Sequence, residues 1–366
     1  MLAQMVNPSD IPRDIHTVVV GAGPAGLMAA RAASAAGPVL LVESSSLPRD
    51  KSCGGMLNEY AQQFLAQIAE VPEEIVLSPR HVNFRYHDWD RDIRKPTELR
   101  FLNVDRRGFD DWLLSLLPEN VSVLPSTTLD GFDAGAGSVV ARLRNGGDPF
   151  EVTSQLLVGA DGARSAIRRG LGIGNVATYV TLQDYVRLDG ELEPFFDCIY
   201  IRDVGDSFAY GSLMPKGEVA IVGSVFYPRT KRPRDKHEQL LETLRATYPL
   251  GPTVKREAAP ALSVRAATDV VPGVGRVLLT GEAGGFMSPT SGEGISYALN
   301  SGLLAGQAIA ENDPDGALAA YSEAAGDIAA NIRRKLRWLP FMESSTGKYL
   351  AGFVPTPIVS RVTRGL

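Results

Sequence analysis

The chain has 366 residues, 44% of them hydrophobic and 22% charged, which is enough to bury one large core or two coupled cores. A formal net charge of -5 lacks the clustered positive charge that binding to nucleic-acid phosphates requires, so nucleic acid is not expected as a partner. Two cysteines and four scattered histidines exclude a disulfide scaffold and give no metal-ligand spacing, so we expect no metal site and a reducing, cytoplasmic setting.

We expect neither a secretion signal nor a membrane span near the N-terminus. Residues 1–14 lack a basic start followed by an apolar run, which a signal peptide would have. The most apolar stretch, residues 18–42, is interrupted by glycines, prolines and Arg31, which a spanning helix would not tolerate together.

The first predicted elements are a strand, a tight turn, a helix and a second strand. A β-branched run at residues 17–20 leads into a glycine-rich turn, an alanine-rich helix follows over residues 25–36, and a second strand covers residues 39–42. The three glycines of the turn permit the sharp bend, a close approach to a pyrophosphate and tight helix packing, and an acidic residue about 20 positions on can accept hydrogen bonds from a ribose. This pattern predicts a dinucleotide site made of Gly21, Gly23, Pro24, Ala25, Gly26, Glu43 and Ser44.

Further along the chain the pattern predicts one helix start, a group of strands and two long helices. Arg107 precedes an amphipathic helix in the segment Val-Asp-Arg-Arg-Gly-Phe-Asp-Asp-Trp-Leu. Short β-rich runs separated by turns fill residues 183–227 and predict an antiparallel sheet inserted into the nucleotide-binding domain. Helical spacing returns over residues 294–310 and 316–338, and Pro340 is expected to end the second stretch.

Two later motifs decide which dinucleotide is expected. Residues 156–168 resemble the internal Asp-Gly motif of FAD enzymes in the para-hydroxybenzoate hydroxylase superfamily. Residues 276–295 resemble the Gly-Asp motif of that superfamily, which holds the flavin ribityl chain, although glutamate replaces aspartate here. The resemblance implies FAD, bound by Asp161, Gly162, Gly281, Glu282, Pro289, Gly292, Gly294 and Ile295, with Arg107 against the cofactor. For Arg107 a solvated helix start is the other interpretation.

The same resemblance implies the fold. It is an α/β fold in which a Rossmann-type FAD-binding domain carries an inserted antiparallel β-sheet substrate domain and C-terminal helices. The helix predicted from Gly294 would direct its N-terminal amides at the flavin, where they stabilise negative charge. We expect the FAD-binding domain over residues 1–75, 100–180 and 262–310, the substrate domain over 76–99 and 181–261, and a C-terminal helical segment over 311–366.

A more specific resemblance begins at Cys53-Gly54-Gly55, which is similar to a segment of the geranylgeranyl reductase family whose cysteine lies near the flavin ring. The motifs occur in that family's order from about residue 16 to 310, and the chain looks closest to the CbrA-type flavoproteins within it. One element departs from the family. Where prenyl reductases have Tyr-x-Trp-x-Phe-Pro, this chain has Tyr210-Gly-Ser212-Leu-Met214-Pro. The loss of two large apolar side chains favours a smaller or more polar substrate than a long isoprenoid.

The resemblance implies reduction of carbon–carbon double bonds in an isoprenoid or related apolar substrate by hydride from flavin N5, with Cys53 or Tyr210 as the proton donor. NAD(P)H and a small electron-carrier protein stay open as the electron donor. Two alternatives remain: an FAD-dependent monooxygenase acting on an aromatic or polyketide-like substrate, and a flavin-binding resistance or sensor protein without turnover. The run Ala-Gly-Gly-Phe after Glu282 differs from the Ala-His common in hydroxylases and favours the reductase.

For the loop at residues 49–55, a purely structural interpretation stands beside the functional one. Arg49 and Lys51 either contact the flavin or an anionic substrate, or form a surface charge pair. Cys53 lies either beside the flavin or as a small buried side chain before a turn, and its two glycines suit a loop that packs on a ring. The cofactor-binding prediction therefore includes Arg49, Cys53, Gly54 and Gly55, whereas Cys198 is expected to serve packing.

The C-terminal segment at residues 332–342 is basic and apolar together. One interpretation is contact with an anionic membrane surface, as a reductase of lipids would need. The other is a plain helix that covers the FAD-binding domain.

Overall fold

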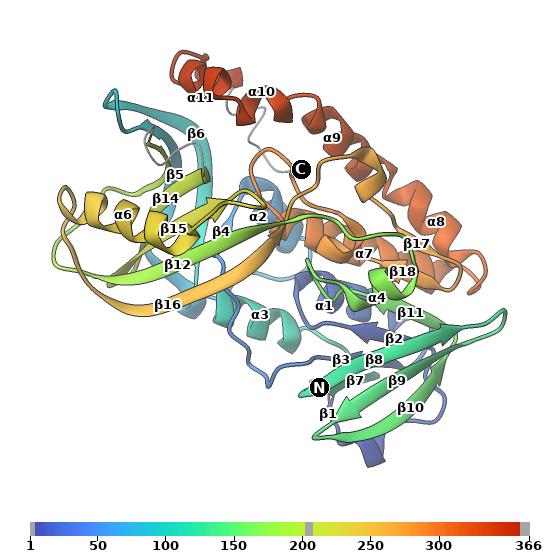
Figure 1. Ribbon diagram of the computed structural model, residues 1–366. Coiled ribbons are helices and arrows are strands. Elements are labelled where there is room, and N and C mark those ends of the chain that lie inside the picture. Colours follow the sequence, from blue (N-terminus) through green and yellow to red (C-terminus); the bar gives the residue numbers. More distant parts are fainter. Residues whose placement is uncertain (1–3, 202–207, 359–366) are drawn as a thin grey trace.

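The computed structural model describes residues 4–201 and 208–358. Residues 1–3, 202–207 and 359–366 lie outside the described part, and they include the first residue of one predicted strand run, Ser207, and the end of the predicted C-terminal segment. Two sheets form two lobes, and a row of helices follows one edge of the molecule (Figure 1). The α/β fold with a Rossmann-type sheet and a second, largely antiparallel sheet is as predicted.

The first sheet has, within the described residues, seven strands in the order β1-β7-β3-β2-β11-β18-β17. All neighbours are parallel except β17 and β18. The strands are β1 (Gln4–Met5), β2 (Thr17–Val20), β3 (Val39–Val42), β7 (Val121–Leu124), β11 (Leu156–Gly159), β17 (Gly273–Val274) and β18 (Val277–Leu279). Strand β2 has β3 on one side and β11 on the other, which makes its carboxyl end the switch point where open α/β sheets bind ligands.

The described residues form ten helices, and two of these helices, α1 and α7, pack unusually closely against each other. They are α1 (Pro24–Ala33), α2 (Glu59–Ala66), α3 (Arg106–Ser115), α4 (Ala166–Gly170), α6 (Pro233–Arg245), α7 (Ile295–Glu311), α8 (Ala317–Ala324), α9 (Gly326–Leu336), α10 (Leu339–Glu343) and α11 (Ser345–Ala351). Helix α7 lies directly on α1 because a Cβ on Gly302 would be 2.2 Å from the Ala25 oxygen, and one on Gly306 would be 2.5 Å from Ala32 Cβ. Glycine at both positions therefore permits this helix contact.

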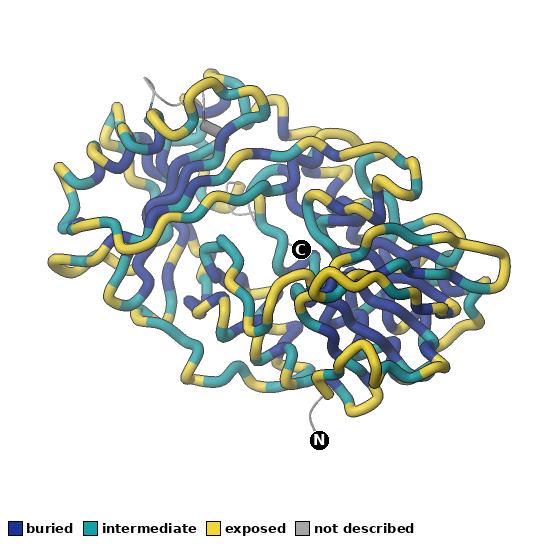
Figure 2. The backbone as a smooth tube through the Cα atoms, turned by 60° about the horizontal axis from the view of Figure 1, so that its bottom comes forward, coloured by how far each residue is buried: buried dark blue, intermediate teal, exposed yellow. Residues whose placement is uncertain are grey.

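Both faces of the first sheet are covered. Val18 and Val20 pack towards a three-stranded sheet, while Val19 packs towards α1, α3 and α7. Successive strand residues point to opposite faces, so a strand buried on both sides has a continuous apolar sequence. The small sheet consists of β8 (Thr127–Ala134), β9 (Val139–Asn145) and β10 (Asp148–Ser154), and it was not predicted from the sequence. Buried backbone accordingly concentrates in the strands (Figure 2).

The second sheet has eight strands among the described residues, in the order β16-β12-β15-β14-β13-β5-β6-β4. They are β4 (Met56–Leu57), β5 (Val76–Asp88), β6 (Ile93–Val104), β12 (Thr178–Leu188), β13 (Phe195–Tyr200), β14 (Phe208–Lys216), β15 (Val219–Phe226) and β16 (Leu250–Leu262). The predicted strands between residues 183 and 227 form its middle. The pairing is antiparallel except between β13 and β5, which run parallel because the β5–β6 hairpin comes from a distant part of the chain.

Helix α6 covers the outer face of this sheet and is anchored by a buried polar group. His237 shares hydrogen bonds with Ser224 Oγ (2.7 Å) and Asp184 Oδ1 (3.1 Å), and Arg256 donates to both oxygens of Asp184 at 2.8 and 2.7 Å. Ser224, His237 and Asp184 are each at most 1% exposed, and their hydrogen bonds join α6 to the sheet. Burial raises the pKa of Asp184, but hydrogen bonds from His237 and Arg256 outweigh it and hold the pKa well below its usual range.

Asp184→Asn is expected to lower the free energy of unfolding at neutral pH by roughly 2 kcal/mol, because hydrogen bonds to a charged acceptor are lost. The pKa of Asp184 is lower in the folded chain than in an unfolded one. Its contribution is therefore complete above about pH 4 and is lost as the pH falls further. Urea denaturation at pH 7 and pH 3 should show a smaller difference between wild type and variant at pH 3. A difference of equal size at both pH values would contradict this assignment.

The C-terminal helices extend from the first lobe to the second. The helical stretch predicted over residues 316–338 is divided into α8 and α9, and Pro340, predicted to end it, does not end the helical structure. Pro340 lies in the first turn of α10. Backbone N–H groups of a first turn have no acceptor within the helix, so a residue without an N–H fits there. No helix in the described part of the chain combines the length and apolarity needed to cross a bilayer.

Candidate functional site

The site begins where four neighbouring parallel strands end. Gly21 follows β2, Glu43 follows β3, Asp161 lies just beyond β11, and Thr280 follows β18. Because the carboxyl ends of parallel strands lie at one edge of the sheet, these residues meet at the switch point.

The glycine turn between β2 and α1 allows no larger side chain at its two ends. Gly21 has a φ of +106°, and a Cβ there would be 2.4 Å from the Ala160 oxygen. A Cβ on Gly26 would lie 1.8 Å from the Gly21 oxygen. Gly23 is the N-cap of α1 and supplies no side-chain cap, so no capping side chain covers the amides of the first turn.

Arg49 and Glu43 stabilise this turn through hydrogen bonds to Ala22 and an ion pair with each other. Glu43 Oε2 accepts a hydrogen bond from the Ala22 amide at 2.9 Å, and Ser44 donates to Oε1 at 3.0 Å. Arg49 Nε lies 3.6 Å from Glu43 Oε2, and its NH2 donates to Asp110 at 3.0 Å. The Arg49 side chain is only 13% exposed, so it is not part of a surface charge pair.

The arginine that faces the site is Arg106, one position before the residue predicted. Arg107 is exposed on α3, whereas Arg106 is buried and lines the cavity described below. Arg106 donates to Asp110 Oδ1 at 2.9 Å and Oδ2 at 3.2 Å, and it also hydrogen-bonds to Cys53. Burial lowers the pKa of Arg106, but Asp110 and Cys53 outweigh it and raise the pKa, so the guanidinium stays charged. We therefore move the predicted cofactor contact from Arg107 to Arg106.

The Cys53-Gly54-Gly55 turn is shaped by its packing on the second sheet. Gly55 has a φ of +61°, and a Cβ there would be 2.2 Å from the Val104 oxygen. A Cβ on Gly54 would be 2.9 Å from Met214 Sδ. The Gly55 amide donates to Cys53 Sγ at 3.5 Å. The sulfur therefore has a guanidinium and an amide as hydrogen-bond donors.

Lys216 packs behind the Cys53 turn and was not predicted from the sequence. Its Nζ donates to Asn103 Oδ1 at 2.7 Å and to the Val104 oxygen at 2.6 Å, and it would lie 2.9 Å from a Cβ on Gly55. Burial lowers the pKa of Lys216 to about 8, against the attraction of Cys53. The two-residue period of a strand could have indicated this position. Met214 and Lys216 are two positions apart and therefore lie on the same face of β14.

The two later motifs contribute buried oxygens without partners in the described part of the chain. Asp161 Oδ2 accepts from the Ala166 amide at 2.6 Å, while Asp161 Oδ1 and Thr280 Oγ1 are buried and have no hydrogen-bond partner there. Burial raises the pKa of Asp161. Glu282 Oε2 lies 3.4 Å from Lys51 Nζ, so the two side chains form an ion pair.

The turn before α7 carries its own buried carboxyl group. Glu293 accepts from the Ser296 amide at 2.8 Å and from Ser296 Oγ at 2.6 Å, and burial raises its pKa. The amides expected to face a flavin are therefore partly taken by this side chain. A Cβ on Gly292 would lie 3.4 Å from the Tyr210 hydroxyl, so Tyr210 contacts this turn from the opposite sheet.

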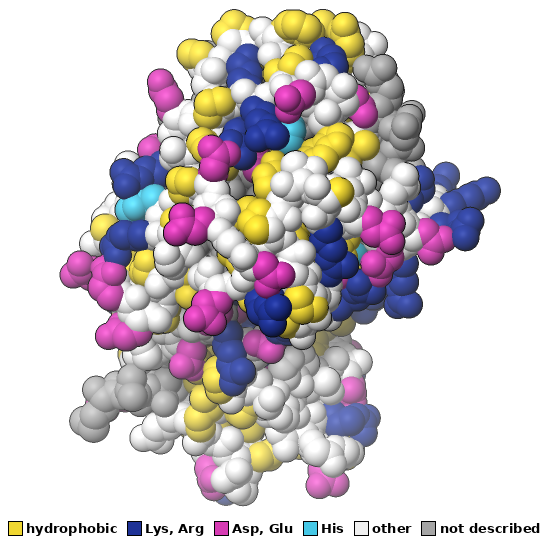
Figure 3. Space-filling model, turned by 90° about the vertical axis from the view of Figure 1, so that its left-hand side faces the viewer, with side chains coloured by type: hydrophobic (Ala, Val, Ile, Leu, Met, Phe, Trp, Pro, Cys, Tyr) yellow, Lys and Arg dark blue, Asp and Glu magenta, His cyan; other side chains and the backbone are white. Residues whose placement is uncertain are grey.

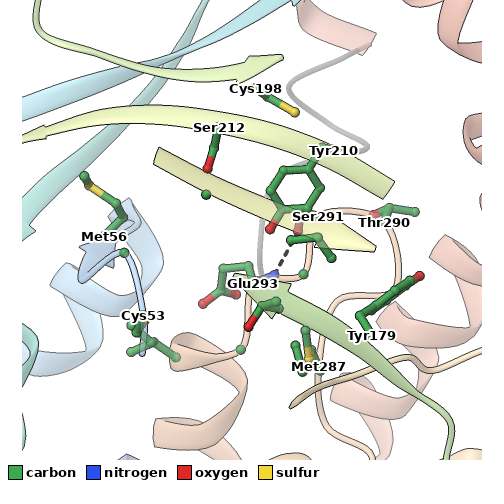
Figure 4. Close-up of a pocket in the computed structure, with 18 of the residues that line it drawn as sticks. Cys53, Met56, Tyr179, Cys198, Tyr210, Ser212, Met287, Thr290, Ser291 and Glu293 are labelled. Atoms are coloured by element: carbon green, nitrogen blue, oxygen red, sulfur yellow. Dashed lines mark hydrogen bonds between the residues drawn. The ribbon is translucent and has the colours of Figure 1, made fainter. Parts of the chain in front are cut away.

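A cavity of about 820 Å³ lies between the switch point and the second sheet. Figure 4 shows Tyr210 at its centre, facing the turn at Ser291 and Glu293, with Cys53 on one side and Tyr179 on the other. Cys198, expected to serve packing, lines the cavity, and burial raises the pKa of its thiol to about 12. Of the predicted site residues, those lining the cavity are Gly23, Pro24, Ala25, Cys53, Gly54, Gly55, Gly162, Tyr210, Gly281, Glu282, Pro289, Gly292, Gly294 and Ile295.

The walls of the cavity are mostly apolar and come from both ends of the chain. Three phenylalanines, Phe84, Phe101 and Phe196, stack edge to face on the side of the second sheet, with ring centroids 5.6 and 6.0 Å apart. The opposite side is lined by Trp338 and by α10 and α11 of the C-terminal segment, including Phe341. No periodic pattern links residues so far apart in the chain, so this part of the cavity was not predicted.

The described residues fit the FAD that the motifs predict. The uncapped start of α1 and its glycine turn suit a pyrophosphate, and Glu43, which accepts from the Ala22 amide within that turn, is the carboxylate that would accept from a ribose hydroxyl. The partnerless oxygens of Asp161 and Thr280 are acceptors that hydroxyl groups of a ligand would satisfy.

Comparison with known proteins agrees with this geometry. The family described as FAD binding domain matches residues 116–335, more than half of the chain. Protein CbrA of Escherichia coli O9:H4 (strain HS) is 28% identical over 325 residues, which cover 87% of this chain and 87% of that protein.

Two solved structures show the same fold with different chemistry. A geranylgeranyl bacteriochlorophyll reductase-like protein of Thermoplasma acidophilum superposes with a TM-score of 0.80 at 20% identity, covering 97% of this chain and 92% of that one. The p-nitrophenol 4-monooxygenase PnpA of Pseudomonas putida DLL-E4 superposes with a TM-score of 0.69 at 16% identity, covering 97% and 100%. At these identities the likeness concerns the fold alone, and the fold is shared by reductases and monooxygenases.

Proposed function

Because the chain belongs to the FAD binding domain family, whose members are oxidoreductases, we propose that it is a flavin-dependent reductase of carbon–carbon double bonds in an isoprenoid or related apolar substrate. The observation that carries this proposal is the apolar cavity beside the Cys53 turn. Its phenylalanine wall and its apolar lining from α10 and α11 suit a substrate without many polar groups. Ser212 and Met214, where larger aromatic groups would narrow the cavity, leave room for a branched or cyclic unit.

When bound and reduced, FAD supplies a hydride to one carbon of the double bond. The second carbon takes a proton, for which the cavity offers Cys53 and Tyr210. Burial raises the pKa of Tyr210 well above its ordinary value, and a phenolate left behind there would be buried. Proton loss from Cys53 leaves a thiolate that accepts hydrogen bonds from Arg106 and the Gly55 amide. We therefore assign the proton to Cys53 and a positioning hydrogen bond to Tyr210.

The test is the rate at which chemically reduced, oxygen-free protein is reoxidised by polyprenyl lipids and quinones, with oxygen admitted afterwards. Chemical reduction makes the result independent of whether NAD(P)H or a small carrier protein is the natural donor. Fast reoxidation by a polyprenyl compound without oxygen, together with a saturated product by mass spectrometry, supports the reductase. Inertness until oxygen arrives, followed by an oxygenated aromatic product, would replace it with the monooxygenase. Inertness throughout indicates a flavin-binding protein without turnover.

Cys53→Ala is expected to lower kcat for double-bond reduction at least 100-fold while the protein keeps its FAD, because the proton donor is removed. Tyr210→Phe should lower kcat by less than tenfold, since only a hydrogen bond is lost. The matched control is Cys198→Ala, the other cavity-lining thiol, which should change KM alone. The measurement is steady-state kinetics, with the flavin content of each variant determined by absorbance. Equal losses of kcat in Cys53→Ala and Cys198→Ala would refute the assignment of the proton to Cys53.

A further inference from the structure

The mouth of the cavity lies at the C-terminal helices. Trp338, Phe341 and Ile358 line the cavity and are also 49%, 41% and 49% exposed to solvent. A side chain that does both stands at the boundary between the cavity and the surface. These three residues therefore lie where the cavity meets the surface, as does Tyr60 on α2, which lines the cavity and is 38% exposed.

Apolar exposure is concentrated at this rim. Six of the eleven exposed large apolar side chains in the described part of the chain lie between residues 338 and 358. We refer to these six as the apolar rim: Trp338, Phe341, Tyr349, Leu350, Phe353 and Ile358. Of the other five, Tyr60 on α2 also lines the cavity, and the rest, such as Val274 on β17, do not. Apolar side chains gather at the top of the molecule, where α10 and α11 lie (Figure 3). A contiguous exposed patch of this kind marks an interaction surface.

The second lobe contacts the apolar rim through hydrogen bonds to its main chain and through the Arg91 guanidinium, which lies 4.1 Å from the ring centre of Tyr349 and 5.1 Å from that of Phe353. Arg91 on the β5–β6 hairpin donates to the Tyr349 oxygen at 2.6 Å, and Tyr86 donates to the Lys348 oxygen at 2.8 Å. Lys95 donates to the oxygens of Gly352 and Val354. The bonds use carbonyl groups of α11 and the residues after it, so the side chains of Leu350 and Phe353 remain exposed.

Positive charge lies next to the apolar rim. Arg333, Arg334 and Arg337 are exposed at the end of α9, directly before Trp338. Among the described basic residues of the C-terminal segment these three are exposed, whereas Lys335 and Lys348 are buried, and the formal charge of the whole chain is -5. An anionic surface therefore attracts this edge of the molecule and repels the rest, which orients the cavity mouth.

We propose that the apolar rim docks on an anionic lipid bilayer, with the cavity mouth facing the membrane. Trp338 and Tyr349 are the residue types that prefer the headgroup level, and the three arginines pair with lipid phosphates. The docked chain lies on the bilayer, as an interfacial segment does. This inference goes beyond the proposed reaction, because it holds whichever apolar compound enters the cavity.

The test is co-sedimentation of the full flavin-loaded chain with vesicles, which needs no substrate. Wild type should pellet with vesicles of phosphatidylcholine and phosphatidylglycerol (7:3) at low salt, and much less with pure phosphatidylcholine or at high salt. Replacing Arg333, Arg334 and Arg337 by glutamine should weaken binding roughly fivefold per charge. Leu350→Ser with Phe353→Ser should weaken it at least tenfold.

Val274→Ser is the matched control, since it removes an equally exposed apolar side chain far from the rim and should leave binding unchanged. Failure of wild type to pellet with anionic vesicles, or equal binding by all variants, overturns the proposal. Sedimentation velocity without lipid tests the competing occupant: a dimer that the Leu350 and Phe353 substitutions dissociate would make the rim a contact between two copies of the chain. None of these results depends on turnover, so they are separate from the test of the reductase.

Discussion

Replacing Arg106 with methionine is expected to lower the free energy of unfolding by about 3 kcal/mol, because the buried Asp110 loses the partner that contacts both of its oxygens. The substitution also removes the guanidinium from Cys53. The Cys53 turn should loosen, and the purified variant should lose most of its FAD. Chemical denaturation and the ratio of flavin to protein absorbance measure the two effects.

Arg107→Met provides the matched control on the same turn of α3. Arg107 is exposed, so its replacement should change stability by less than about 0.5 kcal/mol and leave FAD content unchanged. A second variant separates charge from packing: Arg106→Met combined with Asp110→Asn should recover part of the lost stability, since the buried side chain at position 110 is then neutral and its oxygen can still accept from Arg49. If Arg107→Met proved the more damaging of the two single changes, the assignment of Arg106 to the site would be wrong.

Gly26→Ala is expected to weaken FAD binding at least 100-fold and to destabilise the fold by about 3 kcal/mol. The added methyl group would lie 1.8 Å from the Gly21 oxygen and 3.2 Å from Ala160 Cβ. Helix α1 must then move away from β2, which displaces the amides at its start from the phosphate position. Titration with FAD, followed by quenching of flavin fluorescence, measures the affinity.

Gly137→Ala is the control for the effect of adding a methyl group to a glycine. Gly137 is exposed, and a Cβ there meets nothing within 4 Å. Its replacement should leave FAD affinity unchanged and stability equal or slightly higher, because alanine reduces the conformational freedom of the unfolded chain. An FAD affinity for Gly26→Ala that matched Gly137→Ala would show that the close approach at Gly26 is unimportant.

Local patterns predicted the parts of the site that are contiguous in sequence. The strand at residues 17–20, the glycine turn and α1 follow from apolar periodicity and from the steric needs of a sharp bend, and the structure has them at those positions. The β-rich runs at residues 183–227 likewise became neighbouring strands. In these segments neighbouring residues in the sequence make the deciding contacts.

The failures share a different cause. Arg106 and Arg107 are adjacent and chemically identical, so only the orientation of α3 on the sheet decides which one is buried. The three-stranded sheet of β8, β9 and β10 lies on the opposite face of the first sheet from the helices, and its alternating strands were not interpreted. Lys216 and the lining of the cavity by α10 and α11 depend on contacts between segments more than 100 residues apart. Such contacts leave no periodic signal in a single sequence.

The close contact of α7 with α1 has a consequence for the order in which the protein is made. The glycine turn emerges early from the ribosome, but Gly302, which packs on the oxygen of Ala25, is synthesised about 280 residues later. At elongation rates of about 5–20 residues per second this delay is roughly 15–55 seconds. Until then the first strand, its turn and its helix lack their main covering element and expose apolar surface. The nucleotide-binding half of the site thus waits for nearly the whole chain, and ribosome-bound fragments shorter than about 300 residues should not retain FAD.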